Sequence, residues 1–328
     1  MFASVHHLLE NLPDPLAQDM NSLDLLVYGQ LRSEVSLITE VAGHIISAGG
    51  KRIRPLLVLL TARALGYDGQ QHLTLAAIIE FIHTASLLHD DVVDEAPLRR
   101  GVESANIRFG NAASVLVGDF LHTRAFQLML EVNNLEIMHV LAQTTNAIAE
   151  GEIMQLMKTR QTDISEADYY RIIDAKTARL FEAACTLGAL ISSAPEETVH
   201  AAGKLGKSLG VAFQLTDDHL DYAGQTDQLG KNTGNDLREG KMTLPLIFLM
   251  QHGTQSEKKI IREHIEEGVP GHTEAIIEAV KKSHALQYTH DIALDHIAAA
   301  YSAAEGFPVS PYKNILMDLC SFLARRKH

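Results

Sequence analysis

The sequence predicts an all-α protein, and two observations carry that prediction. No proline lies between Pro97 and Pro195, a stretch rich in Ala, Leu, Glu and Met, and such tracts favour helices. Alternating β-branched patterns are almost absent, so we expect no sheet. With 328 residues, 46% of them hydrophobic and 21% charged, the chain can bury a core. We expect one helical domain over residues 1–328, with residues 1–20 as a peripheral N-terminal segment.

Individual helix starts are also visible. Ser165 with Asp168 resembles a capping box, in which a hydroxyl and a carboxylate three residues on cap the helix reciprocally. Ser310 followed by Pro311 places a capping hydroxyl before a proline suited to the first helical position. A helix near the middle carries glycines that would permit close approach of another helix: Gly203, Gly206 and Gly210. Loops are expected at 66–71, 161–164, 224–240 and 268–271.

Charge and cysteine usage narrow the class of protein. Acidic residues outnumber basic ones 41 to 28, for a net charge of −13, which argues against nucleic-acid binding through bulk positive charge. The two cysteines, Cys185 and Cys320, make neither a disulfide framework nor a zinc site and fit a reducing compartment. The best apolar run, 55–65, is too short to span a membrane, and the N-terminus lacks a signal-peptide layout. We expect a cytoplasmic protein.

Two aspartate-rich segments stand out. Residues 87–94 read Leu-Leu-His-Asp-Asp-Val-Val-Asp, and in a helix Asp90 and Asp94 lie one turn apart on one face, with Asp91 beside them. Residues 214–221 read Gln-Leu-Thr-Asp-Asp-His-Leu-Asp, and helical spacing gives this segment one polar stripe: Gln214, Asp217, Asp218 and Asp221.

Like charges at this spacing destabilise a helix, so a cation should offset them. Magnesium is the natural candidate, because it accepts one or two carboxylates and completes its shell with water and substrate phosphates. Two such faces opposed across a cavity could hold a diphosphate through several metal ions. The alternative for a single cluster is solvated surface, and a second copy in an apolar helix disfavours it.

Basic segments complement these clusters. Residues 49–55 read Gly-Gly-Lys-Arg-Ile-Arg-Pro, where the glycines allow close approach to an anion and arginine can bind phosphate oxygens bidentately. Further cations lie at 97–101, at 176–179 and in the glycine-punctuated loop 231–241. Each segment alone is weak evidence for an anion-binding site, but together they indicate a strongly anionic substrate.

One competing pattern needs weighing. Glu80 with His83, and Glu136 with His139, have the Glu-x-x-His spacing of di-iron carboxylate bundles. That interpretation predicts an iron protein and leaves both aspartate clusters and the basic segments unexplained.

Taken together, these motifs resemble the trans-isoprenyl diphosphate synthases, from about residue 20 to residue 325 and with every signature in order. Within that family the closest resemblance is to bacterial members that make octaprenyl diphosphate for quinone side chains. The resemblance implies an antiparallel helical bundle around a deep central cavity, a homodimer, and three magnesium ions per active site. It also implies the reaction: an allylic diphosphate, expected to be farnesyl diphosphate, ionises and isopentenyl diphosphate attacks the resulting cation, repeatedly.

Residue roles follow from the same resemblance. The magnesium ligands are Asp90, Asp94 and Asp217, and the remaining aspartates, Asp91, Asp218 and Asp221, support catalysis. Lys51, Arg54, His83 and Arg100 resemble the isopentenyl diphosphate site. Six residues resemble the allylic diphosphate site: Arg99, Lys176, Thr177, Gln214, Lys231 and Lys241. Of these, Lys176 and Lys231 are also expected to be catalytic. His219 and Thr216 depart from the apolar residues usual beside the second cluster, and we expect His219 to point outward.

Product length can be argued from steric room before Asp90. Ser86 and Ala85 lie about one turn earlier on the helix, with Ile82 and Phe81 a turn beyond. In the family, bulky aromatics at the nearer positions stop growth at short products. Small residues here predict a long product, and the resemblance implies that this product is octaprenyl diphosphate.

Several alternatives stay open from the sequence. A synthase of another chain length would differ only in product. A terpene cyclase should lack the 49–55 segment, and a non-catalytic subunit should have lost one aspartate cluster. Transient membrane contact for release of an apolar product is also expected.

Overall fold

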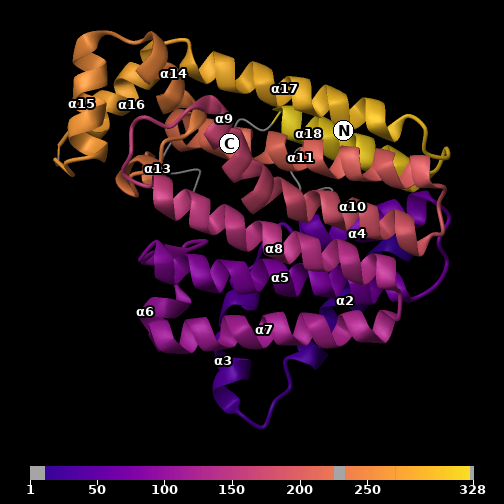
Figure 1. The fold of residues 1–328 in the computed structure, drawn as a ribbon. Coiled ribbons are helices and arrows are strands. Elements are labelled where there is room, and N and C mark those ends of the chain that lie inside the picture. Colours follow the sequence, from indigo (N-terminus) through magenta and orange to yellow (C-terminus); the bar gives the residue numbers. More distant parts are fainter. Residues whose placement is uncertain (1–11, 225–232, 270, 326–328) are drawn as a thin grey trace. The chain divides into compact units, whose positions relative to one another are not determined.

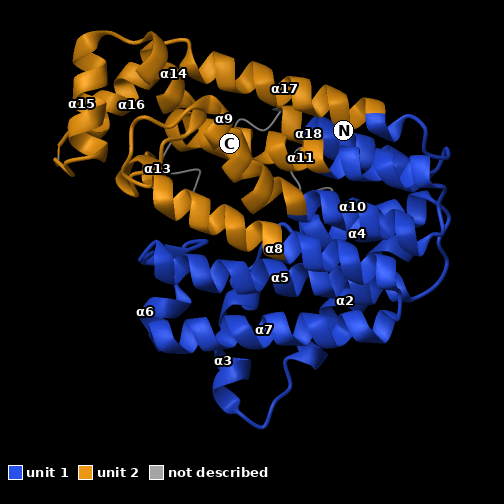
Figure 2. Ribbon diagram, in the orientation of Figure 1, with its two compact units in different colours: residues 1–145, 180–206, 303–322 blue, residues 146–179, 207–302, 323–328 orange. Residues whose placement is uncertain are grey.

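The computed structural model describes residues 12–224, 233–269 and 271–325, and these fold almost entirely as helices (Figure 1). This confirms the all-α prediction. The chain divides into two compact units, described separately below (Figure 2). Unit 1 comprises residues 1–145, 180–206 and 303–322, and unit 2 comprises 146–179, 207–302 and 323–328. Four long helices contribute residues to both units: α8 (Leu135–Lys158), α11 (Glu196–Ala223), α17 (Ala285–Ala304) and α18 (Pro311–Arg325).

Unit 1 is built mainly from the N-terminal helices. Its other elements are α2 (Asp14–Gln30), α3 (Ser36–Ser47), α4 (Ile53–Ala64), α5 (Gln71–Val93), β1 (Leu98–Arg99), β2 (Val102–Glu103), α6 (Ala105–Phe109), α7 (Asn111–Val132) and most of α10 (Arg179–Ile191).

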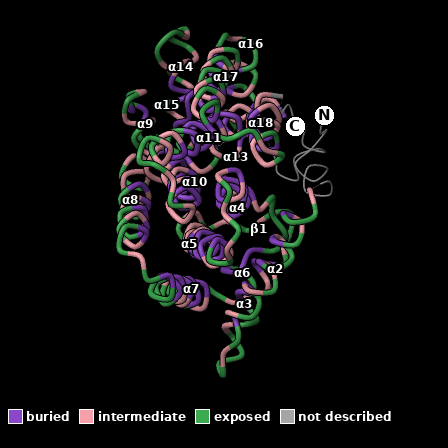
Figure 3. Tube along the Cα trace, turned by 90° about the vertical axis from the view of Figure 1, so that its right-hand side faces the viewer, coloured by how far each residue is buried: buried purple, intermediate pink, exposed green. Residues whose placement is uncertain are grey.

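The centre of unit 1 is formed by α4 and α5. Most of α4 is buried, and α5 packs against α2, α4 and α7. α5 is buried along most of its length, whereas α7 alternates between buried and exposed residues (Figure 3). Among the described residues α5, rather than the 55–65 run, has the length and composition of a membrane span. Since 67% of its apolar window is buried, its apolar side chains serve the core.

Close helix contacts in unit 1 depend on glycine. A Cβ at Gly188 of α10 would lie 2.7 Å from the carbonyl oxygen of Val58 in α4. A Cβ at Gly206 of α11 would lie 2.2 Å from the carbonyl oxygen of Phe181. Any side chain at either position would push the helices apart, so Gly206 does permit the close approach that its spacing predicted.

The N-terminal segment differs from expectation. Residues 1–11 lie outside the described part of the chain, but residues 14–20 are not peripheral, because they form the start of α2 with Leu16 fully buried. Asp19 accepts two hydrogen bonds from Arg63, both 2.8 Å, and His72 lies 3.1 Å from the same carboxylate. Such a paired, buried charge fixes α2 against α4 and α5.

A small hairpin corrects the expectation of no sheet. β1 and β2 pair antiparallel, two residues each. They are joined by Arg100 and Gly101, with φ of 54° and 78°. Two successive positive φ values are the signature of the type I′ turn that closes two-residue hairpins. Strands this short carry no alternation for sequence inspection to detect.

Unit 2 completes the chain. Besides its parts of the shared helices, it contains α9 (Glu166–Ile173), the π-helical turn η1 (Asp174–Ala178), α13 (Asn235–Arg238), α14 (Leu244–His252), α15 (Gln255–Ile265) and α16 (Thr273–Lys282). α9 begins at Ser165 with the predicted capping box, and Ser310 caps α18 through the N–H of Lys313 at 3.1 Å.

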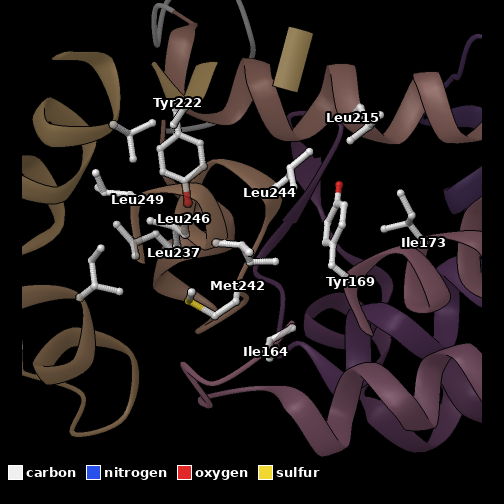
Figure 4. Close-up of a cluster of buried hydrophobic side chains, with 14 of the residues drawn as sticks. Ile164, Tyr169, Ile173, Leu215, Tyr222, Leu237, Met242, Leu244, Leu246 and Leu249 are labelled. Carbon is white, nitrogen blue, oxygen red and sulfur yellow. The ribbon is translucent and has the colours of Figure 1, made fainter. Parts of the chain in front are cut away.

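The core of unit 2 gathers around two buried tyrosines, Tyr169 and Tyr222 (Figure 4). Leu215, Leu244 and Leu246 are among the aliphatic residues of this cluster. Tyr169 directs its hydroxyl toward the helix that carries Leu215 and Tyr222, which is α11 (Figure 4). The core therefore presents one polar group to the helix that bears the second aspartate cluster.

Candidate active site

The first aspartate cluster lies at the C-terminal end of α5. Asp90 and Asp91 occupy its last turn, and Asp94 is the C-cap, whose N–H donates to the carbonyl of Asp90 at 2.8 Å. A helix C-terminus carries partial negative charge, so three carboxylates there require nearby positive charge. Asp90 and Asp94 are half-buried oxygen donors one turn apart, which suits a hard cation completed by water and phosphate. The donor set therefore fits magnesium.

Asp91 differs from its neighbours because it is fully buried. Its Oδ1 accepts hydrogen bonds from Arg99 Nε, at 2.8 Å, and Nη2. Burial raises the pKa of Asp91, while Arg99 acts in the opposite direction. Its Oδ2 is buried and has no hydrogen-bond partner among the residues that the structure describes. Asp91 is therefore directed inward, and through Arg99 it fixes the hairpin that follows the cluster.

The hairpin also positions Arg100. Its guanidinium lies against Gly50, where a Cβ would be 2.6 Å from Arg100 Nη1. The glycine pair of the 49–55 segment thus provides close approach, here to a guanidinium of the same unit.

Arg54, His83 and Arg100 lie near one another in unit 1. Arg54 Nη1 donates to His83 Nε2 at 3.1 Å, and its guanidinium lies 4.7 Å from the ring centroid of Phe181. The pKa of His83 is well below its usual value because of burial, and then because Arg54, Arg100 and neighbouring arginines repel a further positive charge. His83 is therefore a neutral acceptor that orients Arg54. Lys51, the fourth predicted member, is exposed in the loop before α4.

The sequence did not reveal that the carboxylate of Glu80 balances the charge of these cations. Arg52, at the left-handed φ of 47°, pairs with the buried Glu80 and lies 3.5 Å from Asp24. Burial raises the pKa of Glu80, and Arg52, Arg100 and Arg54 counteract it. Helical spacing alone suggested a metal ligand at Glu80, and only the fold reveals its arginine partner.

This arrangement argues against the di-iron alternative. Glu80 is already paired with Arg52, while Glu136 and His139 are both exposed on α8. Within the described ranges, no group of three His, Cys, Asp or Glu side chains could hold a metal ion without further ligands.

The second aspartate cluster ends α11 in unit 2. Asp218 is buried and accepts hydrogen bonds from Gln214 Nε2, at 2.7 Å, and from the Tyr169 hydroxyl. Thr177 Oγ1 donates to Gln214 Oε1 at 2.9 Å. Burial raises the pKa of Asp218 to about 7, against the effect of these hydrogen bonds. Asp218 is therefore the centre of a chain that orients Gln214 and Thr177.

Asp221 also has protein donors on both oxygens. The backbone N–H groups of Asn235 and Asp236 donate to it at 3.0 and 3.1 Å, so it caps α13. The single polar stripe expected from helical spacing is therefore divided: Asp218 and Asp221 bind protein donors, and Asp217 is half-buried. Proximity along the helix could not distinguish these environments.

One pocket in unit 2, of about 140 Å³, collects most of the predicted allylic-site residues. Its polar lining comprises Gln155, Lys158, Thr159, Lys176, Thr177, Gln214, Asp218, Asp236, Lys241 and Thr243. Lys176 Nζ lies 2.6 Å from Glu152, and Lys241 Nζ lies 2.7 Å from Glu239. Three lysines among the lining residues suit an anionic ligand.

Lys176 and Thr177 lie on η1, a π-helical turn of the kind often found at functional sites. α8 approaches it closely, since a Cβ at Gly151 would lie 2.8 Å from the backbone nitrogen of Lys176. Glycine at 151 is thus required for the contact that holds the turn against α8.

The other predicted residues are placed as follows. Arg99 lies in unit 1, bonded to Asp91, and Lys231 lies outside the described residues. Phe81, Ile82 and Ala85 are buried on α5, and the hydroxyl of Ser86 donates to the His83 carbonyl at 2.8 Å. These four residues precede Asp90 on one continuous helix, as expected.

The two unusual residues of the second cluster face away from the pocket lining. His219 Nδ1 lies 3.1 Å from the Leu286 carbonyl of α17, and the Thr216 hydroxyl donates to Ala212 at 2.7 Å. His219 therefore contacts another helix instead of pointing to solvent.

These features define a helical protein with two carboxylate-rich helix ends and a lysine-lined pocket. The sequence profile of the polyprenyl synthetase family matches residues 35–282, and the chain belongs to this family. It is 46% identical over 319 residues to octaprenyl diphosphate synthase of Escherichia coli K12, covering 97% of this chain and 99% of that one. It is 47% identical over 323 residues to the enzyme of the same name from Haemophilus influenzae, covering 98% and 97%.

The chain also resembles solved structures of polyprenyl synthases. A decaprenyl diphosphate synthase from Rhodobacter capsulatus matches with a TM-score of 0.92 and 42% identity, over 98% of this chain and 99% of that one. A polyprenyl synthase from Caulobacter crescentus, complexed with calcium and isoprenyl diphosphate, matches with a TM-score of 0.93 and 42% identity, over 99% and 98%. The family and fold predicted from the sequence motifs are thereby confirmed.

Proposed function

We propose that this protein is a trans-polyprenyl diphosphate synthase that extends farnesyl diphosphate with isopentenyl diphosphate to octaprenyl diphosphate, for quinone side chains. The single observation that carries the proposal is the pocket of unit 2. It groups Lys176, Thr177, Gln214 and Lys241 around one space suited to a diphosphate. The chain is 46% and 47% identical to two octaprenyl diphosphate synthases over nearly its full length, and this supports the proposed length of the product.

In the proposed reaction, the bond between the allylic carbon and its diphosphate oxygen breaks, and the double bond of isopentenyl diphosphate attacks the resulting cation. A proton then passes to the departing diphosphate. Lys176 and Lys241, which line the pocket, are proposed to stabilise the charge that develops on the leaving group, and preorganised charge of this kind is a large contribution to catalysis. Thr177 and Gln214 orient the same diphosphate.

Asp90 and Asp94 in unit 1, and Asp217 in unit 2, are the proposed magnesium ligands. Asp90 and Asp94 lie at the C-terminal end of α5, where carboxylates need positive charge, and this supports their assignment. Asp217 is a half-buried carboxylate of the second cluster, as a ligand shared with substrate and water would be. When bound, three magnesium ions would neutralise charge on the leaving diphosphate. Arg99 and Lys231 are proposed to add fixed positive charge to the same substrate.

Lys51, Arg54 and Arg100 are proposed to bind isopentenyl diphosphate, with His83 orienting Arg54. The neutral state of His83 supports this division, because a neutral imidazole accepts a hydrogen bond from the Arg54 guanidinium and adds no positive charge that would repel it.

The protein is further proposed to be a cytoplasmic homodimer whose residues 1–328 form one catalytic domain. An exposed apolar stripe on α7 supports association between copies: Val115, Leu116, Phe126 and Leu130. Release of the apolar product is proposed to involve transient membrane contact.

The experiment that tests the function is product analysis. Purified protein with magnesium, farnesyl diphosphate and radiolabelled isopentenyl diphosphate should give octaprenyl diphosphate by chromatography. A nonaprenyl product is the second candidate, because the chain is 44% identical to a nonaprenyl diphosphate synthase of Rhodobacter capsulatus. Absence of any prenyl product would refute the proposal.

The chain-length proposal is tested on α5. Ala85→Phe should shorten the products, because an aromatic ring would fill the space beside this buried alanine one turn before Asp90. Ser86→Phe serves as the second variant, and Leu25→Phe on an exposed face of α2 is the control. Unchanged products from both α5 variants would contradict the assignment.

A further inference from the structure

We propose that Lys158 is an additional binding residue for the diphosphate of the allylic substrate and for the inorganic diphosphate released from it. The inference rests on the proposed function and adds a residue to which neither the sequence motifs nor the family resemblance assigned a role. It starts from a contrast among the three lysines of the pocket in unit 2.

Lys176 and Lys241 each have a short glutamate contact, at 2.6 and 2.7 Å. Lys158 lines the same pocket, and its single side-chain partner within the described ranges is Asp168, at 3.8 Å. Both side chains of that pair are about one-third exposed, with values of 34% and 33%. Exposed ion pairs at this distance stabilise little, so the ammonium can leave Asp168 at small cost.

Asp168 does not depend on Lys158. Its Oδ2 already accepts the Ser165 hydroxyl at 2.9 Å and the Ser165 N–H at 3.4 Å, as part of the capping box of α9. Movement of the lysine toward the pocket would therefore leave no unpaired carboxylate.

The backbone holds Lys158 at a fixed place relative to the other two lysines. It is the last residue of α8, and two residues later Arg160 N–H donates to the carbonyl of Gly240, adjacent to Lys241, at 2.9 Å. Gly240 has φ of 74°, and a Cβ there would lie 2.9 Å from Arg160 Cγ. Two turns earlier on α8, Glu152 contacts Lys176. α8 and the turn that follows it therefore contact both segments that carry the other two lysines.

The chemistry matches an anion whose charge increases. Diphosphate carries several negative charges, and the charge on the leaving group grows as the allylic bond breaks. A third ammonium group on the pocket wall should bind both the substrate diphosphate and the free diphosphate product. Isopentenyl diphosphate, assigned to cations of unit 1, should not respond to Lys158.

The test is Lys158→Met, assayed in the full-length protein with magnesium. The KM for farnesyl diphosphate and the Kd for inorganic diphosphate, measured by titration calorimetry, should each rise about tenfold, the value of one charge-assisted hydrogen bond. The KM for isopentenyl diphosphate and the thermal midpoint should stay unchanged. Lys158→Arg should restore binding of inorganic diphosphate.

Lys259→Met is the matched control, because it removes the same charge from an exposed lysine of unit 2. If Lys158→Met and Lys259→Met bind inorganic diphosphate equally well, the role of Lys158 is wrong, even when the protein is an active synthase. An equal rise in the KM values of both substrates would also overturn it. Failure of the wild-type protein to make any prenyl product would instead refute the proposed function.

Discussion

The two aspartate clusters look alike in sequence but are held by different kinds of interaction. At the end of α5, the buried Asp91 is bound by the guanidinium of Arg99. At the end of α11, the buried Asp218 is bound by the neutral groups of Gln214 and Tyr169. In both clusters the middle aspartate faces the protein, and the preceding aspartate, Asp90 or Asp217, is only half-buried.

The difference teaches how a carboxylate-rich helix end can be built in two ways. A charge pair gives a strong contact whose loss leaves a cation without its partner. Neutral donors give weaker contacts that transmit orientation, here along the chain from Tyr169 through Asp218 and Gln214 to Thr177. We therefore expect the α5 end to be sensitive to charge removal and the α11 end to be sensitive to geometry.

The largest effect should come from the half-buried members. Asp90→Asn and Asp217→Asn should each lower kcat about a hundredfold to a thousandfold, since each removes a proposed metal ligand from the leaving-group environment. Initial rates across a magnesium titration measure this. Asp295→Asn, an exposed change on α17, is the control. If only one variant loses activity, the two clusters do not share a metal-binding role.

The next effect separates the middle aspartates by stability. Asp91→Ala should lower the free energy of unfolding by about 3 kcal/mol, because it leaves the largely buried Arg99 guanidinium unpaired. Urea unfolding gives the value, and the double variant with Arg99→Met should recover part of it. Full additivity of the two changes would show that the pair is not coupled.

A smaller loss is expected at the α11 end. Tyr169→Phe should lower the free energy of unfolding by about 1–2 kcal/mol, the cost of one hydrogen bond to a buried carboxylate. It should also lower kcat, since Asp218 then holds Gln214 less firmly. Tyr170→Phe, at the adjacent tyrosine, is the control. A loss as large as that of Asp91→Ala would remove the distinction between the clusters.

The smallest effect concerns pH and His83. The pKa of its imidazole is lowered in the folded state, so below about pH 6.5 the unfolded chain binds a proton that the folded chain does not. Stability is therefore complete above that pH and falls as pH decreases, by about 1.4 kcal/mol at one pH unit below. Urea unfolding at pH 7.5 and 5.5 should show His83→Gln losing less stability than wild type. Equal losses of stability in the two proteins would show that the pKa of His83 is not lowered in the folded state.

Much of this organisation could be predicted from the sequence. The fold class, the Ser165 capping box and the positions of both aspartate clusters depend on local spacing, which the chain carries explicitly. The hairpin at Arg100 could not be predicted, because two-residue strands have no pattern.

The pairs of residues that are far apart in the sequence could not be predicted either. Glu80 and Arg52 are 28 positions apart, and Tyr169 and Asp218 are 49 apart. Pairing over such separations is decided by helix packing. The expectation that the aspartates of α11 share one environment was wrong for the same reason. Spacing shows which residues share a face of a helix, but not which hydrogen-bond donors that face meets.

The hydrogen bonds of the π-helical turn at Asp174–Ala178 span one residue more than those of an α-helix. Deleting Ala175 would let this stretch wind as a regular α-helix, in which each residue turns by about 100° from the last, so Lys176 and Thr177 would take different positions relative to the preceding turn. Lys176 and Thr177 would then leave the wall they share with Gln214. A more regular and better hydrogen-bonded helix would thus be a worse scaffold for handling diphosphate.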